Sequence, residues 1–99
     1  SKEMGELKPG EKTAVELERQ VRAFQGWPGS YITIQDTLLA IKSAKATNKS
    51  APIGKINRDG KTLLLGCKQG SLQIDLIQPA GKKPMDALGF ANGYKNLIS

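Results

Sequence analysis

Histidine is absent from the 99-residue sequence, which removes the most common general base and the most common metal ligand in proteins. The single cysteine, Cys67, excludes an internal disulfide and a cysteine-rich zinc site. No apolar run approaches the roughly 20 residues of a membrane-spanning helix, and residues 1–12 contain no apolar segment of secretory type. The sequence therefore argues against catalysis by these residues and favours a cytoplasmic setting without membrane contact.

Aromatic residues are also few, with one tryptophan, two tyrosines and two phenylalanines. Proteins that bind single-stranded nucleic acid use several exposed rings as stacking platforms. Phe24, Trp27 and Phe90 are expected in the core, and Cys67 is expected to be packed rather than reactive. If the chain binds nucleic acid, we therefore expect it to do so through backbone charge and shape.

Positive charge is plentiful and unevenly placed. The formal net charge is +6, but residues 1–30 hold five cations and five anions, so the whole excess lies in residues 31–99. A surface of one sign attracts polyanions, nucleic acid first among them. If these cations share one face of the fold, they form a binding surface, whereas for any single one a solvated surface role is the alternative. The candidate contacts are Lys42, Lys45, Lys55, Arg58, Lys61, Lys68, Lys82 and Lys83.

A helix is predicted to begin at Thr13, because Thr13 and Glu16 have the spacing of a capping box. Apolar residues then follow at spacings of three and four, and Pro28 is expected to end the helix. The apolar stripe consists of Ala14, Leu17, Val21 and Phe24. The preceding residues 1–12 are polar and contain glycine and proline, which is typical of a linker between domains. Residues 13–99 then form one domain.

After residue 29 the pattern changes to that of short β-strands separated by turns. Asp59-Gly60 predicts a tight type I′ hairpin turn, and residues 71–76 alternate between polar and apolar. Five short strands favour a small closed or partly open barrel. The strands are expected at 30–34, 38–46, from about 53, 62–67 and 71–77, and a last helix is expected from Asp86 through Phe90, ending by Gly93.

The corner Trp27-Pro28-Gly29 joins the predicted helix to the barrel. Trp27 is expected to plug the barrel against Phe24, with stacking on a base as the alternative. Arg22 is expected to form an ion pair that fixes the helix on the barrel, with a phosphate contact as the alternative. Arg22, Phe24, Trp27, Pro28 and Gly29 are therefore assigned structural roles.

Two stretches together resemble the C-terminal domain of the methionyl-tRNA formyltransferase family. An Arg-Gln-Val-Arg-Ala helix runs into Trp-Pro-Gly at residues 19–29, and Gln-x-x-Gly-Lys-Lys-x-Met begins at Gln78 and is followed by Asn92-Gly93. The likeness covers roughly residues 13–96. Gly26 stands where the family more often has proline, which should change only the local backbone.

The resemblance implies a mainly β fold, a small OB-like open Greek-key barrel with an N-terminal helix and a short C-terminal helix. It also implies a parent enzyme that transfers a formyl group from 10-formyltetrahydrofolate to methionyl initiator tRNA in a separate N-terminal catalytic domain. This domain would then hold neither cofactor, metal nor catalytic residue. Its partners would be initiator methionyl-tRNA and the catalytic domain of the same chain, in a monomeric protein.

Two other functions stay open at this point. A related formyltransferase acting on a folate or a nucleotide sugar would use a similar barrel as a purely structural domain, but such a barrel does not need the positive excess. A free-standing OB-type RNA-binding protein is disfavoured by the linker-like N-terminus and the small number of aromatic residues.

Overall fold

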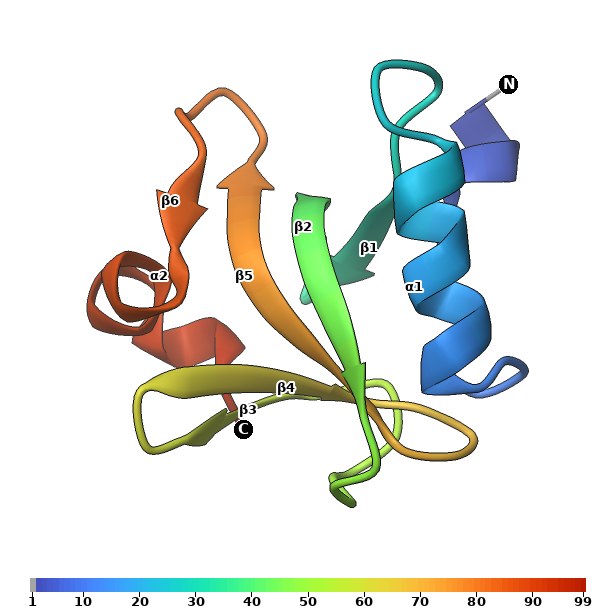
Figure 1. Ribbon diagram of the computed structural model, residues 1–99. Helices are drawn as coiled ribbons and strands as arrows, with labels where there is room; N and C mark the ends of the chain where they lie inside the picture. Colours follow the sequence, from blue (N-terminus) through green and yellow to red (C-terminus); the bar gives the residue numbers. More distant parts are fainter. Residues whose placement is uncertain (1) are drawn as a thin grey trace.

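A curled antiparallel sheet organises the structure, and the computed structural model describes residues 2–99, with side chains from residue 4 (Figure 1). The strands follow the order β1-β2-β5-β4-β3, and β6 pairs with β5. The consecutive strands β3, β4 and β5 lie side by side while β2 returns beside β5, which is a Greek-key arrangement. The strands are β1 Tyr31–Ile34, β2 Thr37–Thr47, β3 Ile56–Asp59, β4 Thr62–Gly66, β5 Ser71–Pro79 and β6 Met85–Asp86.

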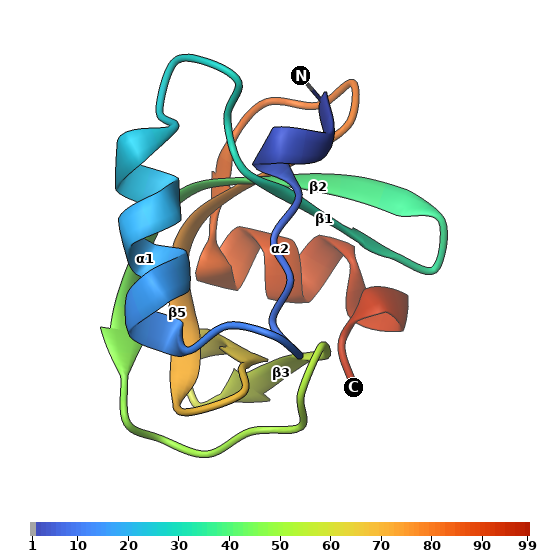
Figure 2. The ribbon, with the colours of Figure 1, turned by 90° about the vertical axis from the view of Figure 1, so that its right-hand side faces the viewer.

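Two α-helices lie on opposite sides of β2 and β5 in the view of Figure 1, and Figure 2 shows the same arrangement turned by 90°. α1 (Ala14–Ala23) contacts β2 and β5, whereas α2 (Ala87–Gly93) contacts β4, β5 and β6. Leu17 of α1 and Phe90 of α2 are fully buried in one core together with Leu39 and Ile74. Short 3-10 helices are η1 (Lys2–Gly5) and η2 (Lys95–Leu97). The prediction of a mainly β open barrel with two helices is confirmed.

The capping box predicted for α1 is present. The Thr13 backbone N–H donates to Glu16 Oε1 at 2.9 Å, and the Glu16 N–H donates to Thr13 Oγ1 at 3.2 Å. The helix ends at Ala23 with Phe24 as its C-cap, so the expectation that Pro28 ends it is wrong. Gly26 and Gly29 have φ of 86° and 82°, and the Gly29 N–H donates to the Phe24 carbonyl at 2.8 Å. A glycine-based turn therefore ends the helix before the proline is reached.

The predicted plug at the corner is wrong. Trp27 is 72% exposed, Phe24 is only half-buried, and Phe90 alone of the three predicted core rings is fully buried. The turn formed by the two glycines carries Trp27 away from the apolar stripe of the helix. Arg22 does form an ion pair, but with Glu18 of the same helix (Nε to Oε2, 2.6 Å), so this pair does not fix the helix on the barrel. Cys67 is buried as expected, and its burial raises the pKa of the thiol.

The predicted β3–β4 hairpin exists, but its turn is of another type. Asp59 pairs with Thr62, so Gly60 and Lys61 are the central residues, and of the two only Gly60 has positive φ. This is the φ pattern of a type II′ turn rather than the predicted type I′. Gln35 and Asp36, between β1 and β2, both have positive φ (48° and 65°), which is the type I′ pattern without a glycine. The strand expected from about residue 53 begins at Ile56.

Residues 6–12, predicted to be part of a linker, pack against the barrel. Leu7 is 3% exposed and belongs to the core, and its N–H donates to the Tyr31 carbonyl at 2.8 Å. Glu6 forms a parallel bridge with Tyr31, and the Lys68 N–H donates to the Pro9 carbonyl at 2.6 Å. The segment is thus held by the barrel, whereas its connection to a preceding domain stays a prediction.

Leu7→Ala tests whether the N-terminal segment contributes to the core. We expect the free energy of unfolding to fall by about 2–5 kcal/mol, because the substitution removes a buried side chain and leaves a cavity. The exposed neighbour Lys8→Ala is the control and should change stability by no more than about 0.5 kcal/mol. Urea denaturation measures both; equal stabilities for the two variants would show that the segment contributes nothing.

Glu16→Gln tests the capping box through its pH dependence. The hydrogen bond from the Thr13 backbone N–H lowers the pKa of Glu16, with smaller contributions in the same direction from Lys12 and Lys68. A carboxylate with a lowered folded-state pKa stabilises the fold above its unfolded pKa, and this contribution is lost as the pH falls through the folded value. The stability difference between wild type and Glu16→Gln should therefore be constant above about pH 5 and shrink below it. A difference unaffected by pH in urea denaturation from pH 3 to 7 would contradict the assignment.

Candidate nucleic-acid interface

All eight predicted contact residues are exposed, but they occupy different parts of the fold. Lys42 and Lys45 lie on β2. Lys55 directly precedes β3, Arg58 lies within β3, and Lys61 lies in the β3–β4 turn. The β4–β5 turn carries Lys68, and the β5–β6 connection carries Lys82 and Lys83. Figure 1 places the β5–β6 connection at the end of the molecule opposite the β3–β4 hairpin. The β3–β4 hairpin pairs with β5 as far as Ile74, and the β5–β6 connection follows Pro79, so these cations are distributed over several parts of the barrel. Which of them contact tRNA stays a prediction.

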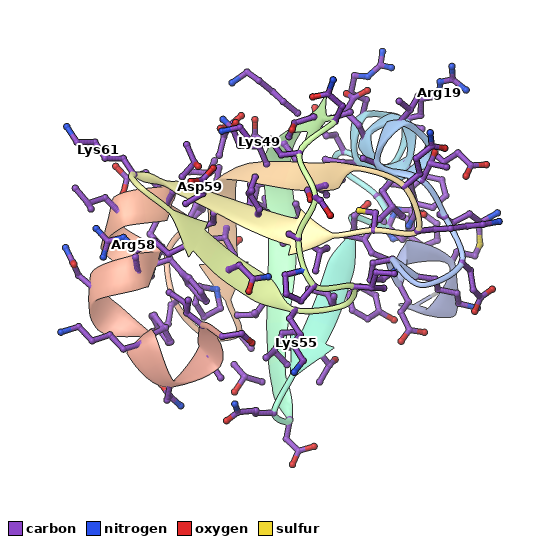
Figure 3. The ribbon with its side chains drawn as sticks, turned by 90° about the horizontal axis from the view of Figure 1, so that it is seen from below. Arg19, Lys49, Lys55, Arg58, Asp59 and Lys61 are labelled. Carbon is purple, nitrogen blue, oxygen red and sulfur yellow. The ribbon has the colours of Figure 1, made fainter. Side chains whose placement is uncertain are left out.

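Four cations of β3, its turn and the adjoining loops are called here the hairpin cluster: Lys49, Lys55, Arg58 and Lys61. Figure 3 shows Lys55 apart from the other three. Lys49 Nζ lies 2.9 Å from Asp59 Oδ2, and this ion pair brings the loop after β2 against the hairpin. Arg58 Nε donates to the Gly60 carbonyl at 2.8 Å, which holds the guanidinium beside the turn. The four cations and Asp59 together carry a net charge of +3.

Lys49 was not among the predicted contacts. It is in the loop after β2, and the residue that pairs with it, Asp59, is ten positions further along the chain. The sequence signal was a cation in a polar loop, which is common on any surface. The Ser71 hydroxyl, buried in β5, donates to the Lys49 carbonyl at 2.7 Å and so fixes the loop that presents this lysine.

The two lysines of β2 are less suited to bind an anion. Lys45 Nζ lies 2.8 Å from Asp75 Oδ2, and Gln73 Nε2 donates to the other oxygen of that carboxylate at 3.2 Å. Lys45 is therefore compensated by a carboxylate across the sheet. Lys42 lies beside the end of α1, where Gln25 Nε2 donates to its carbonyl at 3.1 Å, away from the hairpin cluster.

Lys82 and Lys83 form a second, smaller basic site in the β5–β6 connection. The Lys82 carbonyl accepts from Gln78 Nε2 at 2.8 Å. The backbone N–H of Lys82 donates to the Pro79 carbonyl at 3.0 Å. Gly81 has φ of 77° at the start of this turn. Among the side chains from residue 4 onward, neither lysine has a carboxylate within 4.0 Å. Both ammonium groups are thus presented by an ordered turn.

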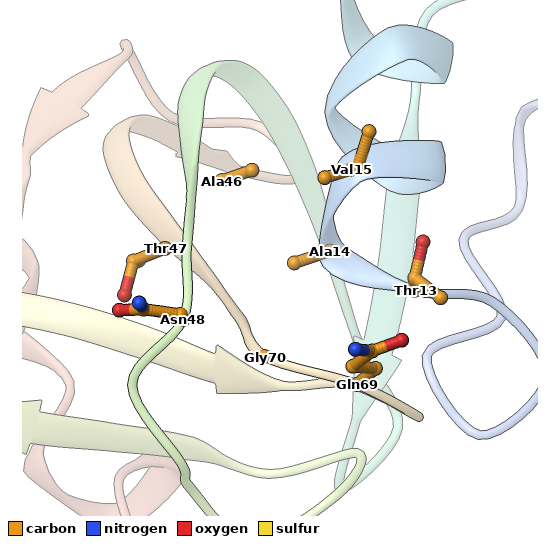
Figure 4. Close-up of a pocket in the computed structure, with 8 residues that line it drawn as sticks. All are labelled: Thr13, Ala14, Val15, Ala46, Thr47, Asn48, Gln69 and Gly70. Atoms are coloured by element: carbon orange, nitrogen blue, oxygen red, sulfur yellow. The ribbon is translucent and has the colours of Figure 1, made fainter.

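A hollow of about 590 Å³ lies between the start of α1, the end of β2 and the β4–β5 turn (Figure 4). Small side chains such as Ala14, Val15 and Ala46 line it together with the backbone of Gly70, and its named lining has no charged side chain. The Thr13 hydroxyl is used by the helix cap, and the Thr47 hydroxyl accepts from the Lys49 N–H at 2.8 Å. This hollow offers no group for acid–base or nucleophilic chemistry.

A second hollow, of about 260 Å³, is lined by Lys61, Asp75 and Asp86 together with apolar atoms. Asp86 is occupied as the cap of α2, accepting from the Gly89 N–H at 2.8 Å. Within the described part of the chain, no three carboxylates or cysteines gather as a metal site. No helix in residues 2–99 has the length and apolar character needed to cross a bilayer.

Comparison with known proteins gives a consistent family. Residues 1–95 match the sequence profile described as "Formyl transferase, C-terminal domain". The methionyl-tRNA formyltransferase of Myxococcus xanthus is 40% identical over 85 residues, covering 85% of this chain and 27% of that protein. That of Methylococcus capsulatus is 40% identical over 86 residues, covering 85% of this chain and 28% of that protein. The chain thus spans little more than a quarter of these relatives.

Among solved structures, HypX from Aquifex aeolicus in complex with tetrahydrofolic acid has a similar fold. Its TM-score is 0.79 at 11% sequence identity, and the match covers 99% of this chain and 18% of that one. This likeness concerns the fold alone. The sequence profile, which covers nearly the whole chain, shows that it belongs to the family of formyl transferase C-terminal domains.

Proposed function

We propose that this chain is the tRNA-binding accessory domain of a methionyl-tRNA formyltransferase. Relatives with that name at 40% identity support the choice of parent enzyme. The observation that carries the binding role is the hairpin cluster, four exposed cations of which only Lys49 is paired with a carboxylate, Asp59, among the side chains from residue 4 onward. The accessory domain holds the initiator methionyl-tRNA, and a preceding catalytic domain of the same polypeptide transfers the formyl group.

The geometry of the hairpin cluster suits the phosphate backbone of folded RNA. Lys and Arg side chains that neutralise phosphates supply most of the sequence-independent affinity for nucleic acid. The bond from Arg58 Nε to the Gly60 carbonyl leaves the two terminal nitrogens of the guanidinium for a phosphate. Of the described rings only Trp27 is largely exposed, so stacking of several bases is not available to this domain.

The formyl donor of the parent reaction, 10-formyltetrahydrofolate, does not suit the residues of this domain. The hollow between α1, β2 and the β4–β5 turn is lined by apolar and neutral polar residues and lacks a cation that would pair with the carboxylates of a folate. Donor binding and catalysis therefore belong to the preceding domain in this proposal. The proposal also places the protein in the cytoplasm as a monomer that binds one tRNA.

Binding of tRNA by the 99-residue chain should be weak and strongly dependent on salt. Three or four phosphate contacts predict a slope of about −2 to −4 for log K against log salt concentration. Filter binding between 50 and 200 mM salt, about a fourfold range, is wide enough to measure this slope. An affinity that does not change with salt would contradict phosphate binding, and no affinity at any salt would favour a purely structural barrel.

Arg58→Ala should reduce the salt slope by about one unit, because one phosphate contact is lost. Arg19→Ala is a matched control, because it also removes one exposed arginine. Arg19 lies on α1, at the side of Figure 3 opposite Arg58. Both variants change the net charge equally, so an effect of overall charge alone would appear in both. Equal slopes and affinities for the two variants would exclude the hairpin cluster as the site.

Lys82→Glu with Lys83→Glu tests whether the β5–β6 connection also meets the RNA. If the RNA spans both ends of the barrel, this double reversal should lower the slope by about two units, one for each lost phosphate contact. The fold should not change, because both side chains are exposed and the turn is held by backbone atoms. Unchanged binding would restrict the RNA to the hairpin cluster.

A further inference from the structure

Trp27 is the most exposed of the large apolar side chains that the structure describes. It is 72% exposed, whereas Ile53 is 56%, Met4 is 55% and Val15 is 49% exposed. It is also the only tryptophan of the chain. Removing an indole ring from water is favourable, and tryptophan is enriched where proteins contact partners.

The loop that carries the ring is held in place by several contacts. Gly29 donates its N–H to the Phe24 carbonyl at 2.8 Å, which closes the loop on the end of α1. Gln25 Nε2 donates to the Lys42 carbonyl at 3.1 Å, which ties the same loop to β2. Gly26 and Gly29 adopt positive φ values that other residues rarely adopt. The exposure of Trp27 is therefore a property of an ordered loop.

The N-terminal segment lies directly beside this loop. A Cβ atom on Gly5 would collide with the Gly29 carbonyl oxygen, so the two backbones are in close contact. Both ribbon views place η1 and the α1–β1 loop at the same end of the molecule (Figures 1 and 2). Met4, on η1, and Trp27 thus expose apolar atoms on neighbouring segments, and these two residues with Pro28 are called here the corner surface.

The charge around the corner surface favours a protein over a nucleic acid. Residues 1–30, which form η1, α1 and the loop, hold five cations and five anions. Arg22, five positions before Trp27, is engaged by Glu18 at 2.6 Å. The hairpin cluster lies at the other end of the barrel in Figure 1. A nucleic acid drawn by charge would meet the four cations of the hairpin cluster first, whereas an apolar corner with one neighbouring cation, Lys42, suits an interface core.

The partner of the corner surface is inferred from the part of the relatives that this chain does not cover. The chain spans 27% of the Myxococcus xanthus protein and matches a family of C-terminal domains, so the rest of such a parent joins at the N-terminal side, next to η1. We infer that the corner surface docks on the preceding catalytic domain of the parent formyltransferase, with Trp27 buried in an apolar pocket of that domain. The inference rests on the proposed function, which supplies the preceding domain.

Hydroxyl-radical footprinting with mass spectrometry tests the docking. The oxidation rate of Trp27 is compared between the 99-residue chain and the intact parent protein, both without tRNA. Burial at an interface core should slow oxidation in the parent by about fivefold or more, since the ring starts from 72% exposure. Val15, exposed at the opposite end of α1, is the internal control and should be oxidised equally in both proteins.

Trp27→Ala and Val15→Ala form the matched pair of variants. In the parent, Trp27→Ala should increase protease cleavage of the segment joining the two domains by about tenfold, because truncating a buried tryptophan weakens an interface strongly. Val15→Ala should leave the cleavage rate unchanged. In the 99-residue chain, Trp27→Ala should not change the melting temperature, which separates lost docking from lost folding.

Several results would overturn the inference. One is equal oxidation of Trp27 in the chain and the parent. Another is protection that appears only when tRNA is added, since the ring would then meet RNA. A third is protection in the 99-residue chain that grows with concentration, which would identify a second copy as the partner. A parent without a formyltransferase domain would instead refute the proposed function itself.

Discussion

The structure depends on the burial of β5 between its neighbours. This strand pairs with β2 on one side and with β4 on the other, and β6 also pairs with its last part. Leu72, Ile74 and Ile77 are fully buried, so β5 contributes the centre of the core as well as the centre of the sheet. Both helices pack against it. The β3–β4 hairpin pairs with β5 as far as Ile74, and the β5–β6 turn follows Pro79, so the second half of β5 lies between these two basic groups.

Local patterns predicted the elements well, because each is determined by neighbours in the sequence. The capping box at Thr13 and the alternation in residues 71–76 are short-range signals, and they correspond to the observed helix and strand. The corner was predicted wrongly because it depends on φ at Gly26 and Gly29, which turns Trp27 outward. A helical stripe extrapolated through Phe24 cannot anticipate that change of direction.

Contacts between distant segments account for most of what the sequence did not reveal. Lys45 is neutralised by Asp75, thirty positions away, and Lys49 reaches the hairpin through Asp59. Composition identified an excess of positive charge past residue 30, but only the pairing of β2 with β5 and the path of the loop after β2 decide which cations gather. The buried position of Leu7, in a segment with the composition of a linker, is another such case.

The two outer strands of the sheet are each covered by an end of the chain. Glu6 bridges to Tyr31 on β1, and Ile98 bridges to Ile56 on β3, where the Ser99 N–H also donates to the Ile56 carbonyl at 2.8 Å. Open sheet edges are templates for strand addition by other molecules and hence for aggregation. These two segments thus cover the edge strands β1 and β3. Proteolytic removal of either segment would expose unpaired backbone N–H and C=O groups to which another strand could bind.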